Sequence, residues 1–254
     1  METLGLALGL SLAVNGLCFV YAVWRRTDRL ADLSYSLSFL LVTGATAAVR
    51  RAWDPVQVLA AGLVGLWALR LGAYLFGRIL RMGRDPRFDG IRERPAAFAK
   101  FWVLQALAVP LVLLPVLQVL GGAPTPPSLW HATGLALWTL GFVLETAADA
   151  QKDAWKRRGG PGFLDRGLYA WCRYPNYLGE MLVWWGLGLY AVPSLQGWGW
   201  LAPAGPLAIT LLLAFGTGIP PLEASREARF GHLPEYRAYR DATPALVPRP
   251  PRRT

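Results

Sequence analysis

Seven long apolar runs divide this chain and constrain its fold more than any other feature. They cover residues 4–24, 34–49, 56–80, 99–120, 129–148, 177–193 and 198–219. A helix needs about 20 mostly apolar residues to cross a bilayer, and a backbone in lipid must satisfy its hydrogen bonds internally. The runs lack the alternating polarity of membrane β-strands. The sequence therefore predicts an all-α bundle of about seven transmembrane helices, in a single integral-membrane domain over residues 1–254, with a tail over 220–254.

The overall composition suits burial in lipid better than burial in a soluble core. Of 254 residues, 54% are hydrophobic and 17% are charged, whereas soluble domains average about 25% charged residues. The twelve Trp and nine Tyr residues are typical of lipid–water interfaces. The first run has no basic residues before it and is longer than the core of a signal peptide, so we expect a retained helix.

Arginine and lysine concentrate in alternate segments between the runs. The basic segments are 25–33, 81–100, 149–176 and the tail from residue 220, whereas 121–128 and 194–197 hold no basic residue and 50–55 holds only Arg50 and Arg51. By the positive-inside rule, the amino terminus is predicted outside and the tail in the cytoplasm. This reading also explains the net charge of +10, so we expect membrane lipids rather than nucleic acid as partners.

Metal chemistry is not expected from this sequence. The chain has two cysteines, Cys18 and Cys172, and two histidines, His131 and His232. None of them forms the closely spaced pairs that zinc sites or disulfide frameworks use.

Charged residues recur at helical spacing where the fifth apolar run ends. Glu145, Asp149, Lys152 and Lys156 share one helical face at intervals of three or four residues. A helix that leaves the bilayer explains the two lysines as solvated charges. It explains the two acids less well, because carboxylates at membrane depth are costly and usually functional.

The segment before the sixth run combines a turn with a predicted helix start. Pro175 disfavours a helical conformation at the residue before it, so Asn176 and Glu180 fall one turn apart at the beginning of a helix. A helix start offers backbone N–H groups to phosphate, and Arg166 and Arg173 add positive charge.

Two aromatic residues in the same segment are Tyr169 and Trp171, whose flat faces could stack on a nucleobase. An ordinary interfacial belt of aromatic and basic residues uses the same residue types. On residue types alone, both interpretations stay open.

Residues 173–180, Arg-Tyr-Pro-Asn-Tyr-Leu-Gly-Glu, resemble the R-x-P-N-Y-x-G-E signature of the steroid 5α-reductase-like superfamily. The helix 138–155, the loop 81–88 and the tail 218–248 resemble an uncharacterised bacterial branch of that superfamily, which is distantly similar to isoprenylcysteine carboxyl methyltransferases. The resemblance runs from about Trp67 onward and is most specific in the block 165–180.

The resemblance implies a multi-pass membrane reductase that uses NADPH. Its substrate would be a lipophilic steroid, sterol or enone that accepts hydride at a carbon–carbon double bond. The implied cofactor-binding residues are Asp149, Lys152, Lys156, Arg166, Arg173, Asn176, Glu180, Tyr236 and Tyr239. Lys156 and Arg173 would meet phosphate groups, while Asp149 and Asn176 would bond amide or ribose groups. A bacterial plasma membrane, with the active site open to the cytoplasm, is the implied location.

The substrate-polarising residues of the better-known steroid reductases are not preserved. Their Gln-Glu pair falls near Tyr35 and Ser36, and their helix-three tyrosine falls near Arg70. We therefore expect Tyr35, Arg70, Tyr74 and Glu145 as the catalytic residues. Arg70 inside an apolar helix needs a partner, which is either a substrate carbonyl or carboxylate, or Glu145 or Asp149 in a structural ion pair.

Two other functions are compatible with the same helices. A methyltransferase that uses S-adenosylmethionine would carry R-H-P in the loop and a pair of glutamates in the tail, where this chain has Tyr174 and Leu222-Glu223. A membrane scaffold that has kept the fold without the chemistry is the third possibility, and cofactor binding separates it from both enzymes.

Overall fold

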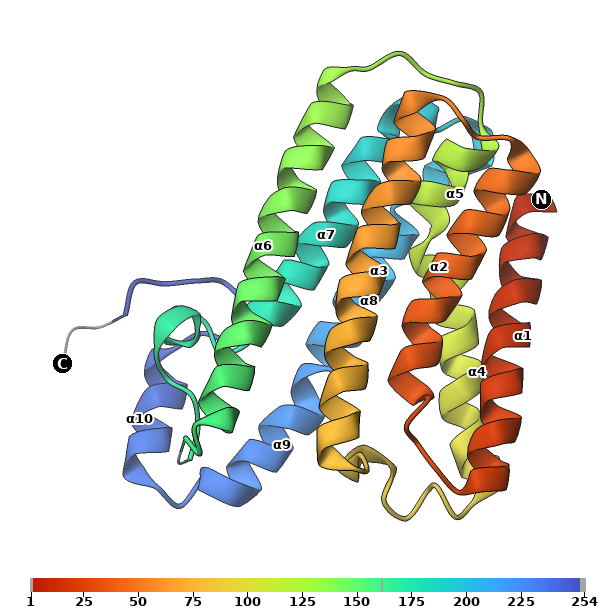
Figure 1. The fold of residues 1–254 in the computed structure, drawn as a ribbon. Coiled ribbons are helices and arrows are strands. Elements are labelled where there is room, and N and C mark those ends of the chain that lie inside the picture. Colours follow the sequence, from red (N-terminus) through yellow and green to blue (C-terminus); the bar gives the residue numbers. More distant parts are fainter. Residues whose placement is uncertain (1, 161, 252–254) are drawn as a thin grey trace. The chain divides into compact units, whose positions relative to one another are not determined.

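The computed structural model describes residues 2–160 and 162–251, which form helices and no β-strand (Figure 1). The α-helices are α1 (Glu2–Arg25), α2 (Ala31–Arg50), α3 (Pro55–Met82), α4 (Pro95–Val112), α5 (Leu114–Gly121), α6 (Leu129–Arg157), α7 (Pro175–Ala191), α8 (Ala204–Phe215), α9 (Ile219–Phe230) and α10 (Pro234–Ala242). The short 3₁₀ helices are η1 (Pro86–Phe88), η2 (Gly167–Ala170), η3 (Val192–Ser194) and η4 (Gly197–Leu201). The predicted all-α class is confirmed for the described residues.

Five segments are long and apolar enough to cross a membrane. They are α1, α2, α3, α4 and the stretch Gly197–Phe230, which contains α8. The predicted spans at 129–148 and 177–193 do form helices, α6 and α7, but α7 has only 17 residues and neither is among the five. A multi-span membrane protein is therefore supported, while the number seven stays a prediction.

The predicted span 99–120 is interrupted in the structure. α4 ends at Val112 and α5 starts at Leu114, with Pro110 inside α4 and Pro115 in the first turn of α5. Proline lacks a backbone N–H and its ring crowds the preceding turn, so two prolines five residues apart favour a break between them.

Contacts divide the chain into two compact units. The first comprises residues 1–131 and 190–205, and the second comprises 132–189 and 206–254. The prediction of a single domain concerns how these units are joined, and it stays a prediction.

The first unit is held together partly by a buried polar network between α1, α2 and α4. The amide of Gln105 donates to Asn15 Oδ1 at 2.7 Å and to the Ser34 hydroxyl at 2.8 Å. Asn15 in turn donates to the Ser38 hydroxyl at 3.0 Å and to the Ser11 carbonyl at 2.9 Å. Because polar groups within an apolar bundle are costly unless paired, these bonds hold the three helices in one register.

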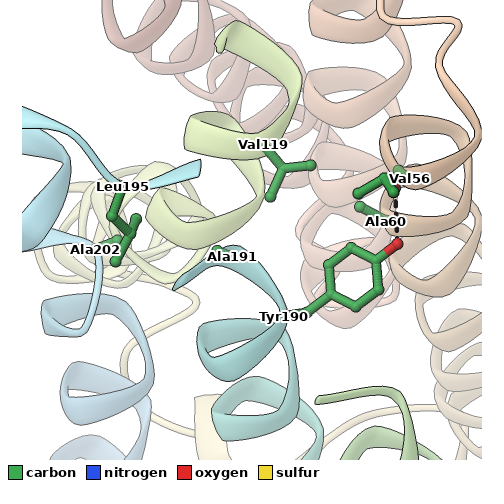
Figure 2. Packing of buried hydrophobic residues seen from close by; sticks show 7 residues of the cluster. All are labelled: Val56, Ala60, Val119, Tyr190, Ala191, Leu195 and Ala202. Carbon is green, nitrogen blue, oxygen red and sulfur yellow. Dashed lines mark hydrogen bonds between the residues drawn. The ribbon is translucent and has the colours of Figure 1, made fainter. Parts of the chain in front are cut away.

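An apolar cluster joins residues 190–205 to α3 and α5. Figure 2 shows Tyr190, Ala191, Leu195 and Ala202 packed with Val119 of α5 and with Val56 and Ala60 of α3. The Tyr190 hydroxyl donates to the Val56 carbonyl at 2.9 Å. This contact explains why the end of α7 and the segment after it belong to the first unit.

Candidate functional site

The predicted site begins with a close crossing of α6 and α7, which run side by side in the second unit (Figure 1). A Cβ atom on Gly141 would lie 2.6 Å from the Gly179 carbonyl oxygen, and one on Gly179 would lie 2.6 Å from the Glu145 nitrogen. A Cβ atom on Gly186 would lie 2.5 Å from the Trp138 nitrogen. Glycines permit helix backbones to touch in this way, and the contact holds the backbone of Glu145 against the start of α7.

The two predicted acids of α6 are buried at this crossing. The exposed fraction is 2% for Glu145 and 6% for Asp149. Asn176 and Glu180 lie in the first two turns of α7, on either side of Gly179. The contact of Gly179 with Glu145 thus brings the part of α6 that carries Glu145 and Asp149 beside the first two turns of α7, which carry Asn176 and Glu180. Asn176 is the second residue of α7, after Pro175, and so it is not the residue that caps this helix.

The loop between α6 and α7 docks on α6 through Gln151. The Leu168 nitrogen donates to Gln151 Oε1 at 2.9 Å, and Gly167 adopts a left-handed conformation with φ of 62°. A Cβ atom on Gly167 would lie only 2.5 Å from Gln151 Oε1. The Tyr169 hydroxyl donates to the Ala148 carbonyl at 3.3 Å. Gly167 is required here both by its φ angle and by this close approach.

The tyrosines of α10 pack against that loop. The Tyr239 hydroxyl donates to the Tyr169 carbonyl at 2.8 Å, and its ring stacks on Phe163 with centroids 5.3 Å apart. Tyr236 meets the same Phe163 ring edge-on at 5.1 Å. Burial raises the pKa of Tyr239 above its ordinary value. Both predicted tyrosines therefore contact the loop between α6 and α7, residues 158–174, which we call the motif loop. The Tyr239 hydroxyl and the buried Tyr169 ring, however, are occupied by contacts within the protein.

Arg173 and Tyr174 meet α9 rather than open solvent. A guanidinium nitrogen of Arg173 lies 3.3 Å from Glu223 Oε1, and the Arg173 side chain is only 14% exposed. The Tyr174 hydroxyl donates to the same oxygen at 2.6 Å, and the Arg226 guanidinium lies 4.8 Å from the centre of the Tyr174 ring. A phosphate contact by Arg173 would have to share or replace its ion pair with Glu223.

The remaining predicted basic residues lie at the end of α6 and in the loop after it. Lys152 is half-buried, whereas Lys156 and Arg166 are exposed. The Arg166 guanidinium stacks 4.7 Å from the centre of the Trp155 ring and lies 3.5 Å from the Asp165 carboxylate. Lys152 and Lys156 follow Asp149 by about one and two turns of α6.

Backbone hydrogen bonds tie the carboxyl-terminal segment to the loop before α7, while residues 248–251 are exposed to solvent. The Arg173 and Tyr174 nitrogens donate to the carbonyls of Pro244 at 2.9 Å and Ala245 at 3.0 Å, and the Arg249 nitrogen donates to the Trp171 carbonyl at 3.0 Å. Proline favours extended backbone in itself and in the residue before it, which suits this pairing. We call residues 244–249 the carboxyl-terminal strap. Residues 252–254 of the predicted tail lie outside the described residues.

The predicted substrate-polarising residues belong to the first unit. Tyr35 meets Phe39 and Trp67 edge-on, with centroid distances of 4.9 and 6.5 Å. Arg70 and Tyr74 follow Trp67 along α3 at successive turns. Tyr35 thus contacts Trp67, and Arg70 lies about one turn after Trp67 on α3. Glu145 belongs to the second unit, so the predicted pairing of Arg70 with Glu145 or Asp149 stays a prediction.

Sequence reasoning missed two structural contributors to this region. Phe163 supplies the aromatic surface for both tyrosines of α10, and the carboxyl-terminal strap supplies acceptors for the motif loop. A glycine-flanked phenylalanine and a Pro-rich tail are weak local signals, so neither pairing was foreseeable. Within the described residues, no group of three His, Cys, Asp or Glu side chains could hold a metal ion.

Comparison of the sequence with known proteins shows the family of this chain. The model described as "Protein of unknown function (DUF1295)" matches residues 18–243. The chain belongs to the DUF1295 family. It is also similar to the uncharacterized protein C594.04c of Schizosaccharomyces pombe, with 27% identity over 284 residues that cover 94% of this chain and 78% of the relative. No solved structure matches the chain.

Proposed function

We propose that this DUF1295 protein is a membrane-embedded NADPH-dependent reductase of a lipophilic steroid-, sterol- or enone-like substrate. The observation that carries the proposal is the α6–α7 crossing, because it gathers Glu145 and Asp149 with the Asn176 and Glu180 of the signature-like stretch. The resemblance of residues 173–180 to the steroid 5α-reductase-like superfamily supports the same assignment.

The residue types at this end of α6 and α7 fit a dinucleotide. The carboxylate of Asp149 can accept hydrogen bonds from amide or ribose hydroxyl groups, which a phosphate could not offer. The first turn of α7 presents backbone N–H groups and a positive dipole end, which suit phosphate. Lys156 and Arg166 add exposed positive charge nearby. When bound, NADPH would supply the hydride. This chain would bind and orient the cofactor and limit the access of water to it.

The proposal includes a membrane topology. Seven spans, an external amino terminus and a cytoplasmic tail would place this end of α6 and α7 at the cytoplasmic face of a bacterial plasma membrane. A reporter fused after Thr254 should then read cytoplasmic, and one inserted in segment 121–128 should read external. Two reporters on the same side would overturn this topology.

The decisive experiment is a titration of the purified protein with NADPH, beside its melting temperature. Asn176→Ala and Asp149→Ala should each weaken NADPH binding about tenfold or more, as expected for a lost hydrogen bond worth about 1.4 kcal/mol, while the melting temperature changes little. Asn15→Ala is the matched control, because Asn15 serves the buried network of the first unit. That variant should melt early and still bind NADPH.

The alternatives appear as other outcomes of the same titration. Binding of S-adenosylmethionine in place of NADPH would favour the methyltransferase, despite Tyr174 standing where that family has histidine. A folded protein that binds neither nucleotide would be the scaffold. Asn176 and Asp149 variants that melt early but bind NADPH normally would make both residues structural.

A further inference from the structure

One end of the first unit carries a layer of ion pairs between the α1–α2 turn and the α3–α4 loop, which lie at the same end of the helices (Figure 1). Asp28 accepts hydrogen bonds from the Arg92 side chain and, at 2.8 Å, from the Asp85 nitrogen. Arg87 bridges Asp85 at 2.7 Å and Asp32 at 2.9 Å. These contacts pin the α3–α4 loop to the start of α2.

This ion-pair layer turns the acidic side chains inward. The side-chain exposures are 2% for Asp28, 7% for Asp85 and 16% for Asp32. Arg78, which lies 2.9 Å from Asp32, completes their neutralisation together with Arg87 and Arg92. The acids of this end are thereby used within the protein and contribute little negative charge to its surface.

The outward surface at this end is consequently cationic. Seven arginines are exposed here. Arg81 ends α3 and Arg87 belongs to the ion-pair layer, and the other five form what we call the arginine rim: Arg25, Arg26, Arg29, Arg84 and Arg94. The exposed acids close to them in sequence are Asp89 and Glu93, and Asp89 lies 3.5 Å from Arg92 of the ion-pair layer. The arginine rim thus has more exposed basic groups than there are exposed acidic groups near it in sequence.

The arginine rim starts where the apolar surface of α1 ends. Trp24 is 74% exposed and Tyr21 is 43% exposed, with their ring centroids 6.2 Å apart. The guanidinium of Arg25 lies 5.4 Å from the centre of the Trp24 ring. Exposed aromatic residues at the end of a membrane helix mark the depth of the lipid headgroups, so the rim lies at that depth.

We propose that the arginine rim is a binding site for anionic phospholipids. Clusters of basic residues beside a membrane helix attract anionic lipids by their charge, and a guanidinium group can add hydrogen bonds to the phosphate oxygens. A phospholipid carries its phosphate directly beside hydrocarbon, and the junction of Trp24 and Arg25 offers a partner for each. Free phosphate lacks the hydrocarbon part and would use the arginines alone.

The test uses the full chain in phosphatidylcholine vesicles with and without phosphatidylglycerol, with lipid retention read by native mass spectrometry. The triple variant Arg25→Gln, Arg84→Gln and Arg94→Gln should retain phosphatidylglycerol about tenfold less than the wild type. The control triple Arg51→Gln, Arg158→Gln and Arg229→Gln loses the same charge elsewhere and should retain it normally. Replacing the three rim arginines by lysine should preserve most of the binding, and high salt should weaken it.

Several outcomes would overturn the proposal. Equal retention by the rim and control variants would show only a general attraction of a basic protein to an anionic surface. Displacement of the lipid by inorganic phosphate at low concentration would make the rim a free-phosphate site. If the glutamine variant melts early in phosphatidylcholine alone, the lysine variant becomes the test of the proposal. A lysine variant that folds normally but loses phosphatidylglycerol would also refute the assignment.

Discussion

The hydroxyl of Tyr174 donates a 2.6 Å hydrogen bond to the carboxylate of Glu223. Arg173, its neighbour in the motif loop, lies 3.3 Å from the same carboxylate oxygen. The loop and α9 therefore share one polar centre. Tyr174 stands where the methyltransferase pattern has histidine, and Glu223 stands where that pattern has one of its two glutamates. The hydrogen bond therefore joins two positions of that pattern.

Removing the Tyr174 hydroxyl should destabilise the protein measurably. Tyr174→Phe leaves Glu223 with Arg173 but without its closest donor, so we expect the free energy of unfolding to fall by about 1–2 kcal/mol. Tyr21→Phe is the control, since Tyr21 is 43% exposed on α1. Denaturant titration of both variants checks this, and equal losses would argue that the 2.6 Å contact contributes little.

The α6–α7 crossing should tolerate no side chain at its glycines. Gly179→Ala places a methyl group 2.6 Å from the Glu145 nitrogen, so the helices must separate at a cost of about 1–3 kcal/mol. Gly62→Ala in α3 has open space around it and should be neutral or slightly stabilising. Thermal unfolding of the two variants compares them directly. A tolerated Gly179→Ala would mean that the crossing is looser than described.

Two left-handed glycines in the loop after α6 separate strain from crowding. Gly162 and Gly167 have φ angles of 69° and 62°, but only Gly167 has a neighbour, Gln151, in the way of a Cβ atom. Gly162→Ala should cost about 1–2 kcal/mol from backbone strain, and Gly167→Ala should cost more. The measurement is the unfolding free energy of each variant. Similar losses would show that Gln151 moves aside without penalty.

The carboxyl-terminal strap should protect the motif loop from exchange with solvent. Truncation after Thr243 removes the carbonyls of Pro244 and Ala245, which accept from the Arg173 and Tyr174 nitrogens. Hydrogen exchange at those two amides should then accelerate at least about tenfold, while amides of α2 remain unchanged. Unaltered exchange at both amides would reduce the strap to a passive tail.

Acid should loosen the α3–α4 loop through Asp85. Burial alone would raise the pKa of Asp85, but the hydrogen bonds and positive charges of Arg87 and the charge of Arg78 outweigh it and hold this pKa below its usual value. A lowered folded pKa stabilises the protein above the unfolded value of about 3.9, and this contribution disappears as the pH falls through the folded pKa. Asp85→Asn should therefore lower the melting temperature at neutral pH, with the difference from wild type shrinking below about pH 3.9. A constant difference down to the most acidic pH would contradict this role.

The sequence determined where most of the apolar helices lie, although the run 99–120 forms two helices, α4 and α5. The apolar runs marked the helices because a bilayer-spanning helix has a characteristic length and composition. Pro175 marked the start of α7 because proline suits a first helical turn and not an interior one. The helical face of Glu145, Asp149 and Lys152 was readable because helix periodicity is local.

Only the tertiary structure decided which partners these residues have. An arginine in a sequence carries the same charge whether it meets a phosphate, a lipid or a carboxylate, and packing assigned Arg173 to Glu223 and Arg92 to Asp28. Gly141 and Gly179 are unremarkable apart, and their meaning arises where two helices touch. Such pairings join residues far apart in the chain, so they depend on how whole helices pack against one another, which no local pattern of residues specifies.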